Sequence, residues 1–348
     1  MDLNGANILI TGGTGSFGNK FTQFILDSYS PNRVVIFSRD ELKQFQMRRR
    51  FPIDNYPHLR MFLGDVRDKD RVYRVVDGSD VIIHAAALKQ VPTAEVNPLE
   101  VIKTNILGAA NVIDAAIDLK VQKVIALSTD KAANPINLYG ATKLCSDKLF
   151  VAANSSGLHN CQFSVVRYGN VSGSRGSVIP YFLAQRDTGI ITITDPRMTR
   201  FSITLDKGVR FVTQCLTEMR GGEIYIPKIP SVKVTQLAKV IAPECEHQVI
   251  GIRPGEKLHE TMITEDDARL AVEFSDHYAI HPSHDYWNNT STTNEPQGTR
   301  CPEGFKYSSD TNDWWLTDNE IGDLITQIQS GEQYDVPDIS EPRFIVGG

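Results

Sequence analysis

A short segment of this chain gathers side chains that can move protons. Thr129, Asp130 and Lys131 stand together, and Tyr139 and Lys143 follow with a spacing of four. That spacing puts the tyrosine and the lysine on one face of a helix, where the positive charge favours the phenolate. We expect this segment to provide a hydroxyl group, an acid, a base and a reactive tyrosine.

The elements around the segment must position these groups. Apolar residues 124–127 precede it and predict a buried strand, and a helix is expected to carry Tyr139 and Lys143. Each signal alone is common on protein surfaces. The segment follows the carboxyl end of a strand, however, which is where ligands bind in an open α/β sheet. The residues before it should then contain a cofactor site.

A glycine-rich turn near the start of the chain fits that expectation. Residues 6–10 form an apolar strand that leads directly into Gly12, Gly15 and Gly18, and a helix through residues 21–26 follows. Such a turn brings backbone close to a pyrophosphate and points the amino end of a helix at its charge. The pattern predicts a dinucleotide-binding site.

The end of the second strand, residues 34–37, bears on which dinucleotide binds. An NAD site usually has a carboxylate there, whereas this chain has Ser38 and Arg39, with Lys43 one turn later. Hydroxyl and basic groups suit a 2′-phosphate better than a diol, so we predict NADP. Asp40 leaves NAD open as the alternative, although its position also suits a helix cap.

Further strands complete the first part of the fold. Residues 61–63 form a third strand, after which Asp65 could bond the adenine amino group, and residues 81–83 form a fourth, before Lys89 at the edge of the cleft. A helix is expected over residues 98–119. Strands and helices that alternate in this way predict an α/β fold with a doubly wound parallel sheet.

The regular alternation weakens in the second half of the chain. We expect a nucleotide-binding domain over residues 1–171, a smaller α/β substrate lobe over 172–280 that is partly interleaved with it, and a covering loop and tail over 281–348. The lobe has several arginines near expected loops, which as a set suit a diphosphate. These arginines are Arg175, Arg197, Arg200 and Arg253.

Composition excludes several classes of function. The chain has 348 residues and a net charge of −6, which argues against a nucleic-acid partner. Five dispersed cysteines predict reduced thiols and a cytoplasmic location. No apolar run is long enough for a membrane span, no signal peptide is evident, and no pattern indicates a metal site.

With these residues in view, the chain resembles the extended short-chain dehydrogenases/reductases that act on nucleotide sugars. Within this group, the chain resembles the inverting UDP-N-acetylglucosamine 4,6-dehydratases, which catalyse the first step of bacterial pseudaminic acid biosynthesis. The resemblance is strong over residues 5–280 and loose in the tail. The segments that carry it are residues 129–143, 167–171, 173–177, 198–201 and 251–260.

The resemblance implies a mechanism. Tyr139 takes the proton of the sugar 4-OH while C4 is oxidised by NADP, Lys143 lowers the tyrosine pKa, and Thr129 hydrogen-bonds the substrate oxygen. Lys131 removes the C5 proton, Asp130 protonates the departing 6-OH, and hydride returns to C6. Lys131 requires a lowered pKa for this role. Related retaining enzymes resemble this chain but have glutamate at the Lys131 position, which favours inversion at C5 here.

The resemblance also implies binding residues and assembly. A homo-oligomer, often a hexamer in this family, and a UDP-sugar substrate are expected. The cofactor positions that it implies are Thr14, Gly15, Ser16, Phe17, Ser38, Arg39, Lys43, Asp65, Val66, Ala86, Thr104, Tyr139, Lys143 and Val171. The positions that it implies for the UDP-sugar are Lys89, Asn170, Arg175, Thr199, Arg253 and Glu256, with Thr129 at the reacting oxygen.

Two other functions stay open at this point. A UDP-sugar 4-epimerase shares the cofactor, Tyr139 and Lys143, but has no need of an acid and a base acting at C5 and C6. The pair Asp130 and Lys131 therefore favours the dehydratase. A non-catalytic NADP-binding regulator could share the fold, and loss of Tyr139 or Lys143 would be its expected mark.

Overall fold

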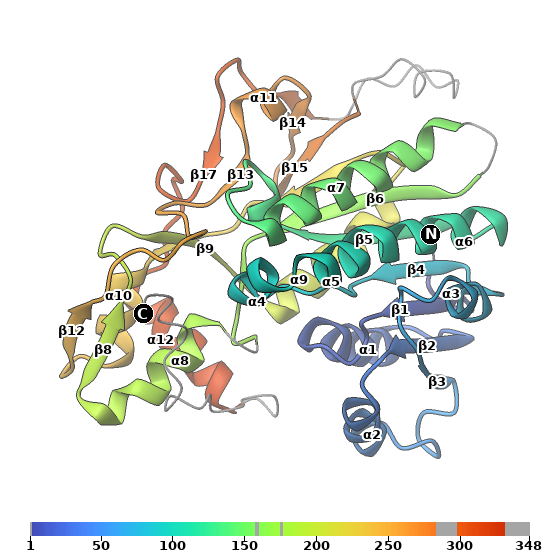
Figure 1. Cartoon of the computed structure of the whole chain (residues 1–348), viewed down its shortest axis with the longest axis horizontal. Coiled ribbons are helices and arrows are strands. Elements are labelled where there is room, and N and C mark those ends of the chain that lie inside the picture. The colour runs from blue at the N-terminus through green and yellow to red at the C-terminus, as the bar shows by residue number, and fades with distance from the viewer. Residues whose placement is uncertain (1, 157–159, 175–176, 283–297, 331–348) are drawn as a thin grey trace.

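The computed structural model describes residues 2–156, 160–174, 177–282 and 298–330 (Figure 1). Its central element is a ten-stranded sheet with the order β16-β14-β15-β10-β6-β5-β4-β1-β2-β3. In the described part of the chain, no helix is both long and apolar enough to cross a membrane.

Seven neighbouring strands of this sheet are parallel. They are β1 (Asn7–Thr11), β2 (Arg33–Ser38), β3 (Leu59–Leu63), β4 (Val81–His84), β5 (Lys123–Thr129), β6 (Gln162–Tyr168) and β10 (Ile224–Pro227). Most of them are almost wholly apolar and buried, because helices cover both faces of the sheet. The predicted doubly wound α/β fold is confirmed.

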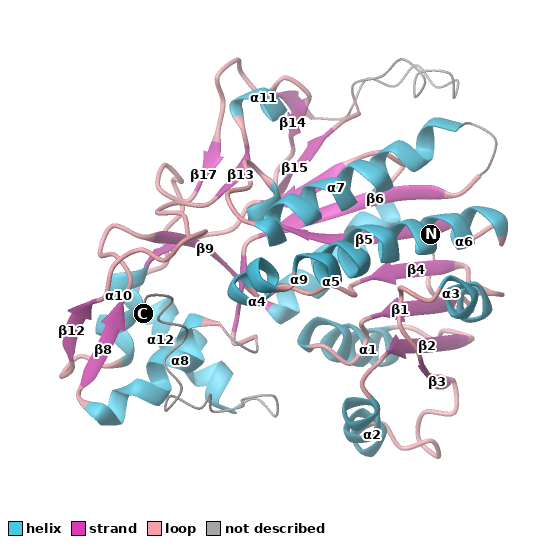
Figure 2. Ribbon diagram, viewed as in Figure 1, coloured by secondary structure: helices cyan, strands magenta, loops and turns pink. Residues whose placement is uncertain are grey.

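Helices form the layers on the two faces (Figure 2). The helices α3, α6 and α7 pack side by side on one face, while α9 packs against α1 and contacts β5 and β6. The covering helices are α1 (Ser16–Ser28), α2 (Glu41–Arg50), α3 (Lys69–Val76), α6 (Gly108–Asp118), α7 (Leu138–Ala152) and α9 (Leu205–Glu218).

The helix predicted over residues 98–119 is divided into three. It consists of α5 (Pro98–Ile102), a π-helical turn (Lys103–Leu107) and α6. Within the π turn, the buried Asn105 amide bonds the backbone N–H and carbonyl of Leu88 and the Thr142 hydroxyl. The turn thus ties the loop after β4 to α7, which a regular helical register would not do.

Strands from the second half of the chain extend the sheet. β15 (His277–Ile280) pairs antiparallel with β10, β14 (Ala271–Glu273) pairs with β15, and β16 (Thr299–Arg300) closes that edge. Residues of the predicted substrate lobe and of the predicted covering segment therefore lie in the main sheet. Residues 283–297 and the tail 331–348 are outside the described part of the chain.

A smaller lobe has its own apolar cluster. Its core joins residues of α8, β8, α10 and α12, so the helix near the end of the chain packs into this lobe. The elements here are α8 (Val178–Gln185), β8 (Ile190–Ile193), α10 (Val234–Ile241), β12 (Glu246–Val249) and α12 (Asp318–Ser330).

Short elements link the two parts. The strands are β7 (Asn170–Ser172), β9 (Thr199–Thr204) and β11 (Ser231–Lys233), which form one small sheet, and β13 (Thr261–Ile263) and β17 (Tyr307–Ser308), which form another. The helices are α4 (Val91–Val96), α11 (Glu265–Ala268) and the 3-10 turns Asp130–Ala132, Ala153–Ser156 and Arg186–Thr188.

Candidate active site

A cleft of about 540 Å³ opens at the carboxyl ends of the parallel strands. It lies where the strand order reverses between β1 and β4, which is the position at which doubly wound sheets bind ligands. The turn after β1, residues 85–87 after β4 and the segment after β5 all line it. The fold therefore unites the two predicted motifs in one cavity.

The glycine-rich turn packs backbone against backbone so closely that a side chain would not fit. Gly12 has φ +64°, and a Cβ there would lie 2.8 Å from the Ala85 carbonyl. A Cβ on Gly18 would lie 2.5 Å from the Cα of Gly13. Gly15 caps α1 without a side-chain bond, so the first N–H groups of the helix face the cleft region unsatisfied by a cap. This geometry fits the pyrophosphate of a dinucleotide.

The predicted cofactor residues separate into two groups. The residues that line the cleft are Gly12, Thr14, Gly15, Ser16, Phe17, Gly18, Lys43, Ala86, Tyr139, Lys143 and Val171. The residues that do not line it are Ser38, Arg39, Asp40, Asp65, Val66 and Thr104. Thr104 is buried in the π turn, where its hydroxyl donates to the Glu100 carbonyl at 2.8 Å.

Most of the second group lies at the ends of β2 and β3. Arg39 reaches Asp65 at 3.6 Å, and Asp65 also binds Arg67 at 2.7 Å. Burial of Asp65 opposes its ionisation, but the bonds from Arg67 lower its pKa overall. Asp40 caps α2 by accepting the Lys43 N–H at 2.9 Å, which confirms the capping interpretation of this residue.

All five predicted catalytic residues line the cleft. Strand β5 ends at Thr129, whose side chain caps the 3-10 turn Asp130–Ala132 and donates to Asp130 Oδ1 at 3.0 Å. Asn137 caps α7 by accepting the Gly140 N–H at 2.8 Å. This cap sets the start of the helix that carries Tyr139 and Lys143.

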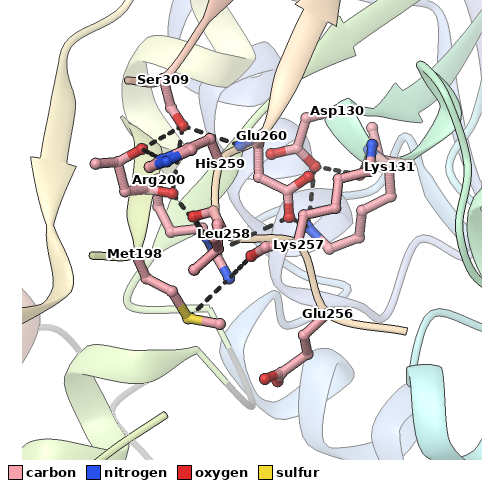
Figure 3. A network of polar contacts seen from close by, with 12 residues as sticks. Asp130, Lys131, Met198, Arg200, Glu256, Lys257, Leu258, His259, Glu260 and Ser309 are labelled. Atoms are coloured by element: carbon pink, nitrogen blue, oxygen red, sulfur yellow. Dashed lines mark hydrogen bonds and ion pairs between the residues drawn. The ribbon is translucent and has the colours of Figure 1, made fainter. Parts of the chain in front are cut away.

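Lys131 lies between two buried carboxylates (Figure 3). Its ammonium is 3.0 Å from Asp130 Oδ1 and 3.2 Å from Glu260 Oε1. Burial alone would lower the pKa of Lys131, but the charges of Asp130 and Glu260 raise it above its ordinary value. The lowered pKa that we expected for a lysine base is therefore wrong for this arrangement, because two anions stabilise the ammonium.

The remaining proton-handling groups are also perturbed. Burial raises the pKa of Asp130, and the nearby Glu260 charge adds to that rise. Burial raises the pKa of Tyr139 to about 12, and the largest opposing effect comes from Lys131 rather than from Lys143. Asp130 is thus favoured as a proton donor in the cleft, and Tyr139 needs further positive charge to ionise.

Lys143 is 3% exposed and points its charge into this environment. Among the described residues, none forms an ion pair with it. Burial lowers its pKa, and Asp147 one turn later opposes this. Asp147 in turn accepts from Ser128 at 2.8 Å and pairs with the buried Arg167 at 3.4 Å. A buried ion network therefore supports the floor of the cleft.

The predicted substrate residues are only partly brought together. Lys89, Thr129 and Asn170 line the cleft, whereas Arg253 and Glu256, 3.9 Å apart, do not. Burial and the Lys131 charge lower the pKa of Lys89. Arg175 lies outside the described residues.

Thr199 and Arg200 have structural partners. The Thr199 hydroxyl is buried, 2.9 Å from His259 Nδ1 and 2.7 Å from Ser309 Oγ. Arg200 donates to the carbonyl groups of Leu258 at 2.9 Å and Lys257 at 3.0 Å. Both residues therefore hold the segment 257–260 in place instead of presenting their polar groups to the cleft.

Arg197, another member of the arginine set that we expected at a diphosphate, pairs with Asp195 at 2.8 Å with its side chain 68% exposed. Together with Arg200, it shows that the set does not converge on one site. Arg253 contacts Glu256 at 3.9 Å, and neither residue lines the cleft.

Hydrogen bonds fasten the segment 251–260 to residues 133 and 137, which follow the 3-10 turn Asp130–Ala132. We call residues 129–133 the catalytic turn. Asn137 donates to the Gly255 carbonyl at 2.8 Å, and Lys257 donates to the Ala133 carbonyl at 2.7 Å. Our site prediction omitted Glu260, Lys257 and Asn137. Their only signal in the sequence was the overall resemblance of residues 129–143 and 251–260 to one family, since nothing local pairs these two segments.

Comparison with known proteins shows the family of the chain. A family profile described as "Polysaccharide biosynthesis protein" matches residues 8–282. The chain is 54% identical over 334 residues to the inverting UDP-N-acetylglucosamine 4,6-dehydratase of Campylobacter jejuni, covering 94% of this chain and 99% of that protein. It is 43% identical over 282 residues to the UDP-glucose 4-epimerase of Rickettsia canadensis, covering 78% and 82%.

A solved structure agrees over the same length. The X-ray structure of Pen from Bacillus thuringiensis superposes with a TM-score of 0.85 and 36% identity, covering 94% of this chain and 99% of that one. The extent of both likenesses spans the glycine turn, the catalytic turn and the clamping segment. The chain belongs to the polysaccharide biosynthesis protein family of extended short-chain dehydrogenases/reductases, in the group that contains the inverting UDP-N-acetylglucosamine 4,6-dehydratases.

Proposed function

We propose that the chain is an NADP-dependent hydro-lyase that converts UDP-N-acetylglucosamine to UDP-2-acetamido-2,6-dideoxy-β-L-arabino-hex-4-ulose, with inversion at C5. The observation that carries this proposal is the meeting of Asp130, Lys131 and Tyr139 in the cleft of the glycine turn. A 4-epimerase needs the tyrosine and its lysine but no acid and base for C5 and C6. The relative from Campylobacter jejuni carries the name of the same activity.

The cleft fits the cofactor. The glycine turn and the buried Lys143 ammonium suit its pyrophosphate and nicotinamide ribose, and Arg39 and Lys43 suit a 2′-phosphate. The side chains of Arg39, after β2, and of Lys43, on α2, are 51% and 44% exposed, and they pair with Asp65 at 3.6 Å and with Asp40 at 3.0 Å. When bound, NADP supplies a reversible hydride acceptor.

Tyr139 starts the chemistry by removing the proton of the sugar 4-OH. Its phenolate is stabilised by the charge of Lys131, and Lys143 lies one turn further along the same helix α7. Thr129 lies at the same edge of the cleft and holds the reacting oxygen. Oxidation at C4 then makes the C5 proton acidic.

Asp130 and Lys131 act at C6 and C5. Asp130 is fully buried, and burial raises its pKa, which favours it as the group that gives a proton to the departing 6-OH. Its Oδ2 has no hydrogen-bond partner among the described residues, which leaves that atom for the substrate. Lys131 receives the C5 proton, and return of a proton to the opposite face inverts C5.

The product is an activated deoxy-keto sugar, so we place this enzyme at the first step of pseudaminic acid or another surface-glycan synthesis. The five cysteines are free, which supports a cytoplasmic location. We propose a homo-oligomeric assembly on the strength of the family resemblance.

The test is NMR of the purified protein with UDP-N-acetylglucosamine in D₂O. A 6-deoxy-4-keto sugar with inverted, deuterated C5 is the expected product. UDP-N-acetylgalactosamine as the only product would replace the dehydratase with an epimerase. Deuterated product with retained C5 would remove the inversion from the proposal.

A further inference from the structure

We propose that Glu260 accepts the ammonium proton of Lys131 inside the cleft, so that the Lys131 amine can then take the C5 proton of the substrate. This inference rests on the proposed function and deepens it. Glu260 acts through Lys131, so it is a positioning and proton-accepting residue. No separate contact with the sugar is assigned to it.

The geometry of Glu260 and Lys131 allows direct proton transfer. Glu260 Oε1 lies 3.2 Å from Lys131 Nζ, within direct reach of a proton on that nitrogen. The Glu260 side chain is 2% exposed and the Lys131 side chain is 25% exposed, so the carboxylate is shielded from bulk water while the lysine is open to the cleft. Figure 3 shows the carboxylate directed toward the lysine from the segment before β13.

Hydrogen bonds of the surrounding residues hold Glu260 in this position. Its N–H donates to Ser309 Oγ at 2.9 Å, and its carbonyl accepts the Ser309 N–H at 2.8 Å. These backbone bonds leave the carboxylate for Lys131, with Arg200 at 4.0 Å. Glu260 Oε2 is buried with no hydrogen-bond partner among the described residues, so the site tolerates a group that can bind another proton.

The charge balance of the site favours proton transfer from Lys131 to Glu260. Lys131 is charged at rest, because Asp130 and Glu260 raise its pKa, and a charged lysine has no lone pair for the C5 proton. Loss of the proton to water would leave the buried Glu260 carboxylate uncompensated. Transfer to Glu260 converts an ion pair into a neutral pair with no change of net charge, which avoids that cost.

Asp130 is the poorer acceptor for this proton. In the proposed function Asp130 gives its own proton to the departing 6-OH, and burial raises its pKa. Lys131 and Arg200 lower the pKa of Glu260 against the effect of burial, so Glu260 is available as the carboxylate. The other titratable or charged groups that face Lys131 or Glu260 from neighbouring elements are Lys89, Tyr139, Lys257 and His259.

The proposed step balances as follows. An Nζ–H bond of Lys131 breaks and an O–H bond forms on Glu260. The freed lone pair then forms a new Nζ–H bond as the C5–H bond of the 4-keto sugar breaks, and its electrons become the C4–C5 enolate. The enolate expels the 6-OH, which leaves as water with the proton of Asp130.

The experiment measures kcat against pH from 6.5 to 9.5 for wild type, Glu260→Gln and Glu260→Asp. At pH 7 we expect Glu260→Gln to lose about 100-fold in kcat, the contribution of one proton-transfer group. Its kcat should then rise about tenfold per pH unit, because Lys131 must lose its proton to solvent and the neutral fraction grows in that proportion below its pKa. Glu260→Asp should recover part of the loss, and the wild-type profile should be flatter.

Asp266→Asn is the matched control, since it removes the same charge from a side chain that is 90% exposed on α11. Its kcat and pH profile should equal those of wild type, and NADP affinity should be unchanged in all variants. A Glu260→Gln enzyme with wild-type kcat, or one with a loss that does not vary with pH, would overturn the proposal. If Glu260→Gln fails to bind NADP, the test is the dependence of kcat on pH for Glu260→Asp. A dependence on pH that is the same as that of wild type would then overturn the proposal.

The proposed function and the role of Glu260 can be refuted separately. Absence of a 6-deoxy-4-keto product from the wild-type enzyme would refute the proposed function itself. Normal product from wild type together with a pH-independent Glu260 variant would refute only the role of Glu260.

Discussion

Gly140 is the point at which the helix of Tyr139 touches the catalytic turn, and we predict that Gly140→Ala disables catalysis while the cofactor still binds. A Cβ at Gly140 would overlap the carbonyl oxygen of Lys131 and lie 3.0 Å from the carbonyl carbon and 3.1 Å from Pro135 Cβ. The backbone of the turn has to move, because neither neighbour is the flexible end of a side chain.

The magnitude follows from the distance that the turn must yield. Ordinary van der Waals contact requires a shift of about 1 Å, and a misplacement of that size costs roughly 100-fold in rate. This corresponds to about 3 kcal/mol of transition-state stabilisation. Gly140 is next to Tyr139, which lines the cofactor cleft, but the glycine turn itself is not altered, so NADP affinity should fall less than kcat.

The assay is kcat for conversion of UDP-N-acetylglucosamine, with NADP affinity measured on the same preparations. Gly322→Ala in α12 is the control, because a Cβ there meets nothing within 4 Å. That variant should keep full activity and gain about 0.5 kcal/mol or more in stability from a helical alanine. A Gly140→Ala enzyme with kcat within threefold of wild type would show that the contact does not fix the catalytic geometry.

Three further variants test separate parts of the site. Lys131→Ala should abolish dehydration and leave NADP affinity intact, and normal turnover would remove Lys131 from the C5 step. Tyr139→Phe should block the first oxidation, seen as loss of reduced cofactor in single-turnover absorbance; full activity would contradict the role of the phenol. Asp147→Ala should lower the free energy of unfolding in urea by about 1–3 kcal/mol, because the buried Arg167 loses one of its two carboxylates and keeps Asp267 at 3.4 Å. A change below about 1 kcal/mol would mean that the buried pair is not needed.

Local features of the site followed from the sequence because their physics is local. The glycine turn requires a strand, small residues and a helix in succession, and all three are consecutive along the chain. The spacing of Tyr139 and Lys143 places them on one face of any helix. Parallel strand order brings both motifs to one edge of the sheet, so it was predictable that the five residues proposed for catalysis would line one cleft.

The helix over residues 98–119 shows where local reasoning was insufficient. Its sequence has ordinary helical character, yet the structure contains a π turn at Lys103–Leu107. The cause is tertiary, since Asn105 bonds Leu88 and Thr142 from two other elements. No periodicity within the helix encodes those partners.

Only the tertiary structure decided the charge state of the catalytic lysine. Lys131 alone in the sequence is a possible base, and its pKa depends on which charges the fold brings close. The fold brings Glu260 to Lys131. It fastens the segment 251–260 by two hydrogen bonds, whose partners are separated in the sequence by 118 positions and by 124 positions. Thr199 and Arg200 were likewise assigned to substrate from sequence, and the fold uses them to hold the same segment. The sequence determined which groups are available, and packing decided which of them face each other, because burial and through-space distance set their energies.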